Sequence, residues 1–244
     1  MILTDDMMNL SGKEKSLSQK IADEIITYII DNNLKTGEKL PNEQALSELL
    51  GAGRSSIREA MKQLETRNIV DIRQGSGTYV SEKKGVLDDP FGLIFVNDKK
   101  KLAKDMLEVR FMIEPKVAAL AASNSTDEEV EELKKVCERV EKLIRNGEDH
   151  TLEDINMHTI IARNSHNIIV PRLIPVINSS IKLFISLTDR SLKDETIMSH
   201  REIVNAIAAH DETAAHDAMY LHLVYNRRRI AELIKNSNFC NSQK

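Results

Sequence analysis

Residues 37–80 read GEKLPNEQALSELLGAGRSSIREAMKQLETRNIVDIRQGSGTYV, and this stretch decides the fold of the N-terminal part of the chain. Its first half predicts two short amphipathic helices separated by a turn at Gly51. Its second half predicts a two-stranded hairpin, because the runs IVDIR and TYVS flank the turn residues 74–77. A further helix precedes them, since SLSQKIADEIITYIIDNN carries isoleucines at helical spacing. Three helices followed by a wing describe a winged helix-turn-helix, a module that reads DNA.

The second short helix, predicted over about residues 54–67, has one face suited to DNA. Guanidinium and hydroxyl groups cluster at its N-terminus, where major-groove readers place base and phosphate contacts. The residues expected to bind DNA on this helix are Arg54, Ser55, Ser56 and Arg58. Its buried stripe is expected to hold Ile57, Ala60, Met61 and Leu64, and the helix before it is expected to turn Ala45, Leu46, Leu49 and Leu50 inward.

The bulk composition narrows the class of protein. The chain has 244 residues, 41% of them hydrophobic, and a formal net charge of −4. That length favours two domains over one. The negative net charge argues against a protein that binds nucleic acid without sequence preference. Residues 51–84, however, contain more Lys and Arg than Asp and Glu, which suits specific DNA binding.

The sequence also predicts where the protein works. No run of 18 uncharged apolar residues occurs, and the start MILTDDMMNL carries acids where a signal peptide would carry lysines. We therefore expect a cytoplasmic protein with no membrane partner. Cys137 and Cys240 have neither the spacing of a zinc site nor the number of a disulfide framework, so we interpret both as ordinary thiols.

Four segments are expected along the chain. Residues 1–84 form the winged helix-turn-helix, 85–101 a linker with a short apolar segment, 102–238 an all-α domain, and 239–244 a polar tail. Only helical patterns occur in the third segment, which predicts about six helices. The fold class is therefore mainly α, with three helices and a two-stranded wing followed by an all-α helical bundle.

Polar side chains on apolar helical stripes predict a metal site in the second domain. Asp154 and His158 stand at i and i+4, so both point the same way, and His200 and His222 lie on similar apolar stripes. Because an unpaired buried carboxylate is costly, a divalent cation is the expected partner, zinc first, with nickel or manganese as alternatives. Any one histidine alone is more often a core or helix-end residue. The other histidines, His150, His166, His210 and His216, are interpreted as surface or cap residues.

Arg110 lies among apolar neighbours in the first helix of this domain. Buried beside a metal, it would bind the carboxylate of a small organic acid or sugar acid bidentately. The alternative is an ion pair with Glu114, four residues on, at the helix surface.

These residues together resemble the GntR family of bacterial transcription regulators, in the FadR-like branch with an all-helical FCD effector domain. The resemblance covers nearly the whole chain. Its carriers in the first domain are Gly37, Leu40-Pro41, Glu43, Arg54, Arg58-Glu59-Ala60 and Gly75-x-Gly77-Thr78. In the second domain they are Arg110 with Glu114, Asp154-x-x-x-His158, His200 with Ile203, Asp211 and His222.

The resemblance implies roles for particular residues. Arg54, Ser55, Ser56 and Arg58 would contact the operator, and Gln74 and Gly75 at the wing tip would enter the minor groove. Asp154, His158, His200 and His222 would ligate the metal, and Arg110 would bind the effector carboxylate. The family also implies a homodimer on a short palindrome of double-stranded DNA.

Three positions depart from the family pattern. Gln44 replaces an arginine that commonly touches DNA, which puts one operator contact in doubt. Gly53 replaces a hydroxyl residue at the helix N-cap, which costs a modest amount of helix stability. Asn68 replaces a glycine at a left-handed C-cap.

The sequence thus predicts a non-enzymatic, ligand-responsive transcription regulator, expected to be a repressor. One alternative is a regulator that responds to an acyl thioester and has a vestigial metal site, which the intact ligand set argues against. Another is a metal-dependent hydrolase fused to a DNA-binding module. That alternative lacks an evident inward Glu or Asp as general base.

Overall fold

A computed structural model describes residues 15–83, 85, 87, 89, 91–188 and 193–241, without the side chains of 175, 176, 234 and 236–241. The chain divides into two compact units, residues 1–88 and 89–244. The acidic start of the chain, from which we argued against a signal peptide, lies outside the described residues. The division between the units falls within the expected linker.

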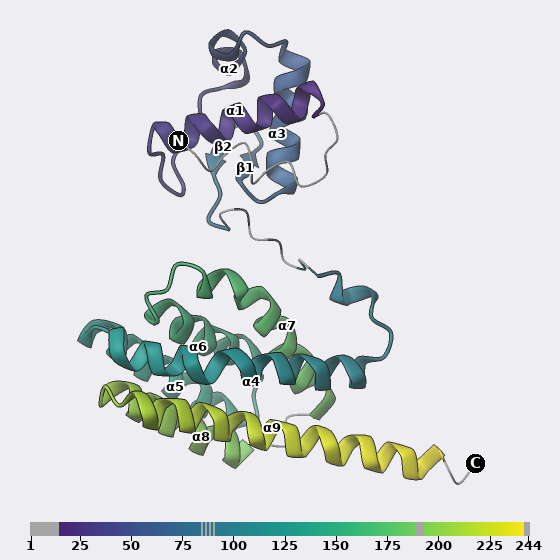
Figure 1. Ribbon diagram of the computed structural model, residues 1–244, viewed down its shortest axis with the longest axis vertical. Helices are drawn as coiled ribbons and strands as arrows, with labels where there is room; N and C mark the ends of the chain where they lie inside the picture. The colour runs from purple at the N-terminus through teal and green to yellow at the C-terminus, as the bar shows by residue number, and fades with distance from the viewer. Residues whose placement is uncertain are drawn as a thin grey trace. The chain divides into compact units, whose positions relative to one another are not determined.

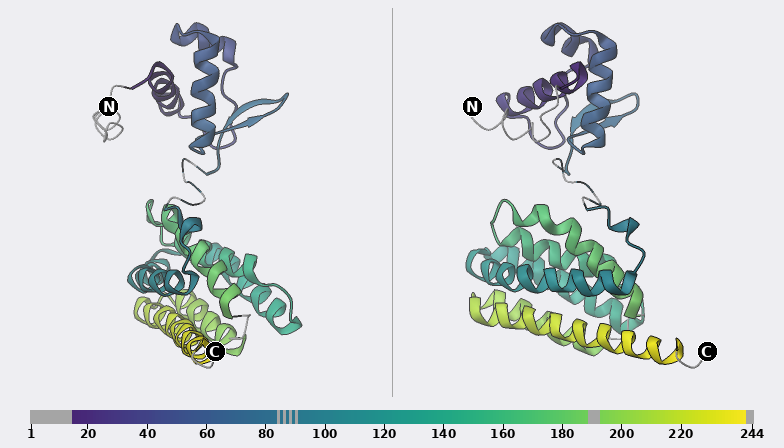
Figure 2. Two further views of the ribbon diagram at one scale, coloured as in Figure 1. Left: turned by 90° about the vertical axis from the view of Figure 1, so that its right-hand side faces the viewer. Right: turned by 45° about the vertical axis from the view of Figure 1, so that its right-hand side comes forward.

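Unit 1 has the element order that the sequence predicts (Figure 1). Three helices precede a two-stranded antiparallel sheet, and Figure 2 shows this hairpin projecting away from the helices. The winged helix-turn-helix is therefore confirmed. Its elements are α1 (Leu17–Asp31), α2 (Glu43–Leu50), α3 (Arg54–Thr66), β1 (Val70–Arg73) and β2 (Gly77–Val80).

Local capping explains where these helices begin and end. Ser16 forms a capping box with Gln19 at the start of α1, and Asn42 accepts a backbone hydrogen bond at the start of α2. Gly53 is the N-cap of α3 and supplies no side-chain bond, as its missing hydroxyl implies. Asn68 has a φ of 54°, so it takes the left-handed conformation expected after the recognition helix.

The core of unit 1 confirms most of the predicted buried stripes. All four predicted residues of α3 are buried, and Ile25 and Leu46 are fully enclosed. The prediction for α2 is partly wrong, because Ala45 and Leu49 are exposed. This helix has only two turns: Leu46 is its one fully buried side chain and Leu50 packs against the core half-buried, so Ala45 and Leu49 face solvent.

The wing pairs Val70 with Val80 and Arg73 with Gly77. A bridge between Lys39 and Tyr79 extends the pairing on the other side of β2. Gly77 has a φ of 122°, and a Cβ built on it would lie 2.6 Å from Cε of Lys39. The lysine side chain therefore lies directly over the tip end of the hairpin.

Unit 2 is an all-α bundle, as predicted. The 3₁₀ turn η1 (Leu93–Phe95) lies in the expected linker, and α4 begins at residue 99, ahead of the expected start at 102. Helix α9 runs to residue 241, into the expected polar tail. The helices are α4 (Lys99–Asn124), α5 (Asp127–Asn146), α6 (Thr151–Asn164), α7 (Val170–Thr188), α8 (Lys193–Ala208) and α9 (Glu212–Asn241).

The long helices α4 and α9 lie side by side along the bundle (Figure 1), and α6, α7 and α8 also pack against α4. Leu133, Met157, Ile203 and Ile207 are fully enclosed between the helices. Among the described residues, α7 alone is long and apolar enough to cross a membrane by length and composition. Its isoleucines lie in the core of the bundle, as those of a buried helix in a globular domain do.

The described thiol, that of Cys137, is free and buried on α5. Burial raises its pKa to about 11, so it is not a reactive thiolate at neutral pH.

Candidate functional sites

The first candidate site is the solvent-facing N-terminus of α3. Arg54 and Ser55 are exposed there and Ser56 is half-buried, while Ile57 points into the core. The backbone amides of the first turn have no side-chain cap from Gly53. Free amides and guanidinium groups at a helix N-terminus suit anionic phosphate oxygens. The predicted DNA-binding residues of this helix therefore share one accessible surface.

Arg58 belongs to the same surface but has a partner in the protein. Its Nε and Nη2 donate to both carboxylate oxygens of Glu43 on α2, with Nη2 2.8 Å from Oε2. The two side chains are 63% and 39% exposed, so DNA can still reach the guanidinium. The hydrogen bond to Arg58 lowers the pKa of Glu43, and the same bond raises the pKa of Arg58.

Helix α3 is fixed to α1 by a polar contact. The buried hydroxyl of Ser18 donates to Glu59 Oε1 at 3.1 Å and accepts from Gln63 Nε2 at 2.9 Å. These bonds hold the orientation of the recognition helix from the side opposite to its exposed arginines.

The wing carries cations that we did not predict as site residues. Gln74 and Gly75 are exposed at its tip, as expected, and Gly75 has a φ of 74°. The guanidinium of Arg73 lies 4.4 Å from the centre of the Tyr79 ring, and Lys39 Nζ lies 5.9 Å from it. Lys39 is far from the wing in sequence, so only the fold places it there.

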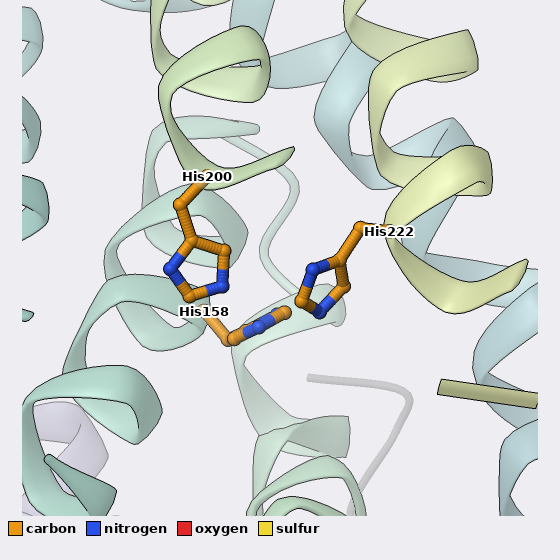
Figure 3. A group of neighbouring side chains, drawn as sticks. All are labelled: His158, His200 and His222. Carbon is orange, nitrogen blue, oxygen red and sulfur yellow. The ribbon is translucent and has the colours of Figure 1, made fainter. Parts of the chain in front are cut away.

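The second candidate site is a group of three buried histidines in unit 2. His158 from α6, His200 from α8 and His222 from α9 face one another (Figure 3). One ring nitrogen of each lies within 4.8 Å of the others, and each residue is at most 4% exposed. The apolar stripes on these helices turn the rings inward, as the sequence predicts.

Asp154 completes what we call the His–Asp cluster: Asp154, His158, His200 and His222. Its Oδ1 lies 3.4 Å from Nε2 of His200 and 3.8 Å from Nε2 of His158. The structure therefore brings together all four residues that the sequence marks as candidate ligands.

Arg110 is buried beside the cluster, as one sequence interpretation expects, and it forms the ion pair with Glu114 that the other expects. It pairs with Glu114, and the two side chains are only 3% and 4% exposed, so a surface location is wrong. The pair is internal because a third group joins it: Nδ1 of His158 lies 2.6 Å from Oε2 of Glu114. Nε and Nη2 of Arg110 donate to the carboxylate, and neither bond uses Nη1.

Glu114 corrects the expectation that no inward acid lies beside the cluster. Burial alone would raise its pKa, but the charge of Arg110 and the hydrogen bonds from His158 and Arg110 outweigh it and lower the pKa to about 2. A carboxylate so stabilised in its ionised form is a poor general base at neutral pH. Glu114 is thus an inward acid that still gives a hydrolase no effective general base.

The other two rings have different surroundings. His222 Nδ1 lies 3.0 Å from Ser199 Oγ, and its Nε2 lies 3.3 Å from Asn226 Nδ2. Neither nitrogen of His200 has a hydrogen bond within the described part of the chain. Burial lowers the pKa of His200 to about 4 and that of His222 well below 6.5, so both rings are neutral at pH 7.

These contacts leave donor atoms that fit a metal. Oδ1 of Asp154, Nε2 of His158 and both ring nitrogens of His200 are buried and make no hydrogen bond to any described residue. Leaving buried polar atoms unsatisfied costs about 1–3 kcal/mol each. Three imidazoles and one carboxylate are ligands that zinc, nickel and manganese accept.

A small cavity of about 20 Å³ adjoins the cluster, which is room for about one water molecule. Its lining combines cations, hydroxyls and amides with apolar residues of α7: Arg110, His150, Asp154, Ile181, Phe184, Ile185, Thr188, Lys193, Thr196, His222 and Asn226. Of the two interpretations of His150, surface or cap residue, the second holds: it occupies the N-cap position of α6, but it is buried and lines the cavity.

Comparison with known proteins gives the family. The model of the bacterial regulatory proteins of the gntR family matches residues 17–80, and the FCD domain model matches residues 105–225. The transcriptional regulator LutR of Bacillus subtilis is 30% identical over 204 residues, covering 80% of this chain and 92% of that protein. A putative regulatory protein of the L-lactate dehydrogenase operon of Escherichia coli is 28% identical over 231 residues, covering 86% and 85%.

A solved structure agrees with these matches. GntR of Streptococcus agalactiae superposes with a TM-score of 0.77 at 41% identity, covering 86% of this chain and 99% of that one. The relatives are transcription regulators, not enzymes. This chain therefore belongs to the GntR family of transcription regulators, in the FadR-like branch whose effector domain is an FCD domain.

Proposed function

We propose that this regulator is a cytoplasmic repressor that binds a divalent metal at the His–Asp cluster and responds to a small carboxylate bound beside it. One observation carries the proposal. Four potential ligands from three helices meet in a buried place, and several of their donor atoms have no hydrogen bond within the described residues. Such an arrangement is costly without a ligand, so a cation is the partner that best balances it.

Asp154, His158, His200 and His222 would hold the metal. Zinc is our first choice, because three imidazoles and a carboxylate match its ligand preference, with nickel or manganese as alternatives. When bound, the metal would supply a Lewis acid to which a carboxylate oxygen of the effector can bind.

Two features support a small carboxylate as effector. The cavity beside the cluster is lined by Arg110 and Lys193, and Nη1 of Arg110 is not used by the pair with Glu114. One relative is named as a putative regulator of an L-lactate dehydrogenase operon, and lactate is a small carboxylate. The cavity of about 20 Å³ would have to widen to admit even a small carboxylate, and an acyl thioester would need a long apolar tunnel as well.

For DNA, we propose that Arg54, Ser55, Ser56 and Arg58 read the major groove of the operator. Gln74 and Gly75 at the wing tip would enter the minor groove. The regulator would act as a homodimer on a short palindrome, since two copies of one DNA-binding domain match the two half-sites of a palindrome.

The two functions would be coupled by the effector. Binding of the carboxylate would favour a state of the protein with lower operator affinity, which requires the effector to bind the two states differently. Saturating effector would then weaken operator binding at fixed salt. An unchanged dissociation constant would contradict this coupling.

Elemental analysis of full-length protein, purified without chelators, tests the metal site directly. We expect about one transition metal per chain, and its loss in the double variant Asp154→Ala, His158→Ala. The control is His166→Ala, because His166 is a half-exposed histidine bound to Glu129, away from the cluster. Absence of metal from the wild-type protein would overturn the metal site and leave Arg110 as the anchor for a metal-free effector.

A further inference from the structure

We propose that Glu114 and Ser199 are positioning residues, which hold His158 and His222 in the tautomer protonated on Nδ1 so that both Nε2 lone pairs face the His–Asp cluster. The inference rests on the proposed metal site and goes beyond its four ligands. It concerns the hydrogen bonds behind the rings, which decide which nitrogen can bind a metal.

The contact between His158 and Glu114 fixes the first ring. An ionised carboxylate can only accept hydrogen bonds, so the His158 nitrogen that lies 2.6 Å from it must carry the proton. Arg110 holds the same carboxylate from its other side, which keeps it ionised and in place. A neutral ring protonated on Nδ1 leaves the lone pair on Nε2, the atom that is buried without a hydrogen bond to any described group.

Two independent contacts fix the second ring in the same way. The hydroxyl of Ser199 donates to the carbonyl oxygen of Glu195 at 2.7 Å, so towards His222 Nδ1 it acts as an acceptor. On the other side of the ring, the amide nitrogen of Asn226 can only donate, and it lies 3.3 Å from Nε2. Both contacts require a proton on Nδ1 and a lone pair on Nε2 of His222, and Asn226 would release that lone pair when a metal binds.

His200 provides a contrast within the same site. Its two nitrogens make no hydrogen bond to any described group, and Asp154 Oδ1 is 3.4 Å from its Nε2. No acceptor of the kind that fixes the other two rings faces its Nδ1 in the described chain. The bundle therefore sets the tautomer of two ligands and leaves the third to be set by what binds.

A purely structural role is the competing explanation, because any buried ring N–H needs an acceptor. The two roles differ in what they predict for metal affinity. Groups that orient metal-bound histidines typically change that affinity about 10–100-fold when they are removed. An acceptor that only satisfies a buried donor would change stability and leave the affinity of the folded protein unchanged.

Ser199→Ala is the decisive variant, because it removes the acceptor behind His222 and leaves a side chain of nearly the same size. Ser125→Ala is its matched control. Ser125 is also buried and also donates to the carbonyl oxygen four residues earlier, that of Ala121, at 2.6 Å, but makes no contact with the cluster. Glu114→Gln is the conservative variant for His158: its amide oxygen can still accept from Nδ1, so the His158 tautomer should stay as in the wild type.

The first measurement uses metal-free, full-length protein with ¹⁵N-labelled histidine. Protonated and lone-pair ring nitrogens have well-separated ¹⁵N shifts, so the tautomer of each buried ring can be read directly. We expect His158 and His222 to be protonated on Nδ1 in the wild type and in Ser125→Ala. In Ser199→Ala, where the Asn226 amide can turn its oxygen towards a protonated Nε2, only His222 should show a mixture of tautomers.

The second measurement is the affinity for Zn²⁺, by competition with a chelator. We expect Ser199→Ala to bind about 10-fold more weakly or worse, and Ser125→Ala to match the wild type. If the wild type binds zinc, but Ser199→Ala keeps a single His222 tautomer and the wild-type affinity, the positioning role is overturned. The metal site itself would still stand. A wild-type protein that binds no zinc would overturn the metal site itself, whatever the tautomers are.

Discussion

The guanidinium of Arg58 and the carboxylate of Glu43 form a bidentate pair that joins the two helices of the helix-turn-helix, with Nη2 2.8 Å from Oε2. The pair sets the direction of an arginine that we propose to contact the operator. Because both side chains are solvent-exposed, the contact orients Arg58 more than it stabilises the fold. A planar guanidinium held on one edge by a carboxylate still offers its other edge to a base or phosphate.

The first prediction follows from this orientation. Arg58→Ala should weaken specific operator binding by about tenfold or more, the scale of losing a bidentate base contact. The melting temperature should stay close to that of the wild type, because no buried group is disturbed. Fluorescence anisotropy on an operator fragment and circular dichroism melting measure the two effects. Glu43→Gln is the control that retains the guanidinium, and a lost melting transition in Arg58→Ala would contradict the prediction.

The cap of the recognition helix gives a second prediction. Gly53 has a φ of −64° and a ψ of 144°, which any residue can adopt, and a Cβ there would have 4.0 Å to its nearest neighbour. Gly53→Ser should therefore supply the missing N-cap bond and raise the free energy of unfolding by a few tenths of a kcal/mol. Urea denaturation measures it, with Gly53→Ala as the control that adds a Cβ but no hydroxyl. Equal stability of the two variants would exclude the capping bond.

The wing gives a third prediction, which concerns salt. Lys39 and Arg73 flank the Tyr79 ring and present two cations beside the hairpin. If they contact phosphates, Lys39→Gln or Arg73→Gln should each reduce the slope of log affinity against log salt by about 1. Lys134→Gln is the control, because Lys134 lies on α5 of the effector domain and pairs with Glu131. A slope unchanged in both wing variants would place these cations away from the DNA.

The sequence predicts the elements of unit 1 well, because caps and turn residues act locally. Ser16, Asn42 and Asn68 each define a helix end from the residues next to them. It also predicts the four residues of the His–Asp cluster, since i, i+4 spacing and apolar stripes fix which face each side chain takes. Contacts between segments that are distant in sequence cannot be predicted in this way. The residues next to Lys39 in the sequence give no sign that its side chain lies over the wing.

The surroundings of Arg110 show the same limit. Its spacing to Glu114 fits an exposed pair as well as a buried one, and the sequence contains no signal that decides between them. The third partner, His158, comes from another helix and makes the pair internal. Similarly, His150 precedes the first turn of α6, where helical periodicity does not indicate whether a side chain is buried, yet it is buried and lines the cavity.

Metal removal gives a fourth prediction. A ligand that binds only the folded state adds about 2.7 kcal/mol of stability at a free concentration of 100 Kd. Adding Zn²⁺ to chelator-stripped wild-type protein should therefore raise its melting temperature by several degrees, and the rise should be absent in His200→Ala. Operator binding of the metal-free His200→Ala protein should remain close to that of the metal-free wild type. Full metal occupancy in this variant would contradict the assignment of His200 as a ligand.

The last prediction concerns the buried pair of Arg110 and Glu114. Glu114→Ala leaves the Arg110 guanidinium buried without its counter-charge, and losing one partner of a buried pair typically costs about 3–5 kcal/mol. The double variant Arg110→Met, Glu114→Leu removes both charges and fills their space, so its free energy of unfolding should exceed that of Glu114→Ala. Urea denaturation of the metal-free proteins measures both. If the double variant were the less stable one, the pair would contribute packing that its charges do not explain. If instead it recovers stability but loses zinc affinity, the ion pair serves the ligand His158 more than the fold.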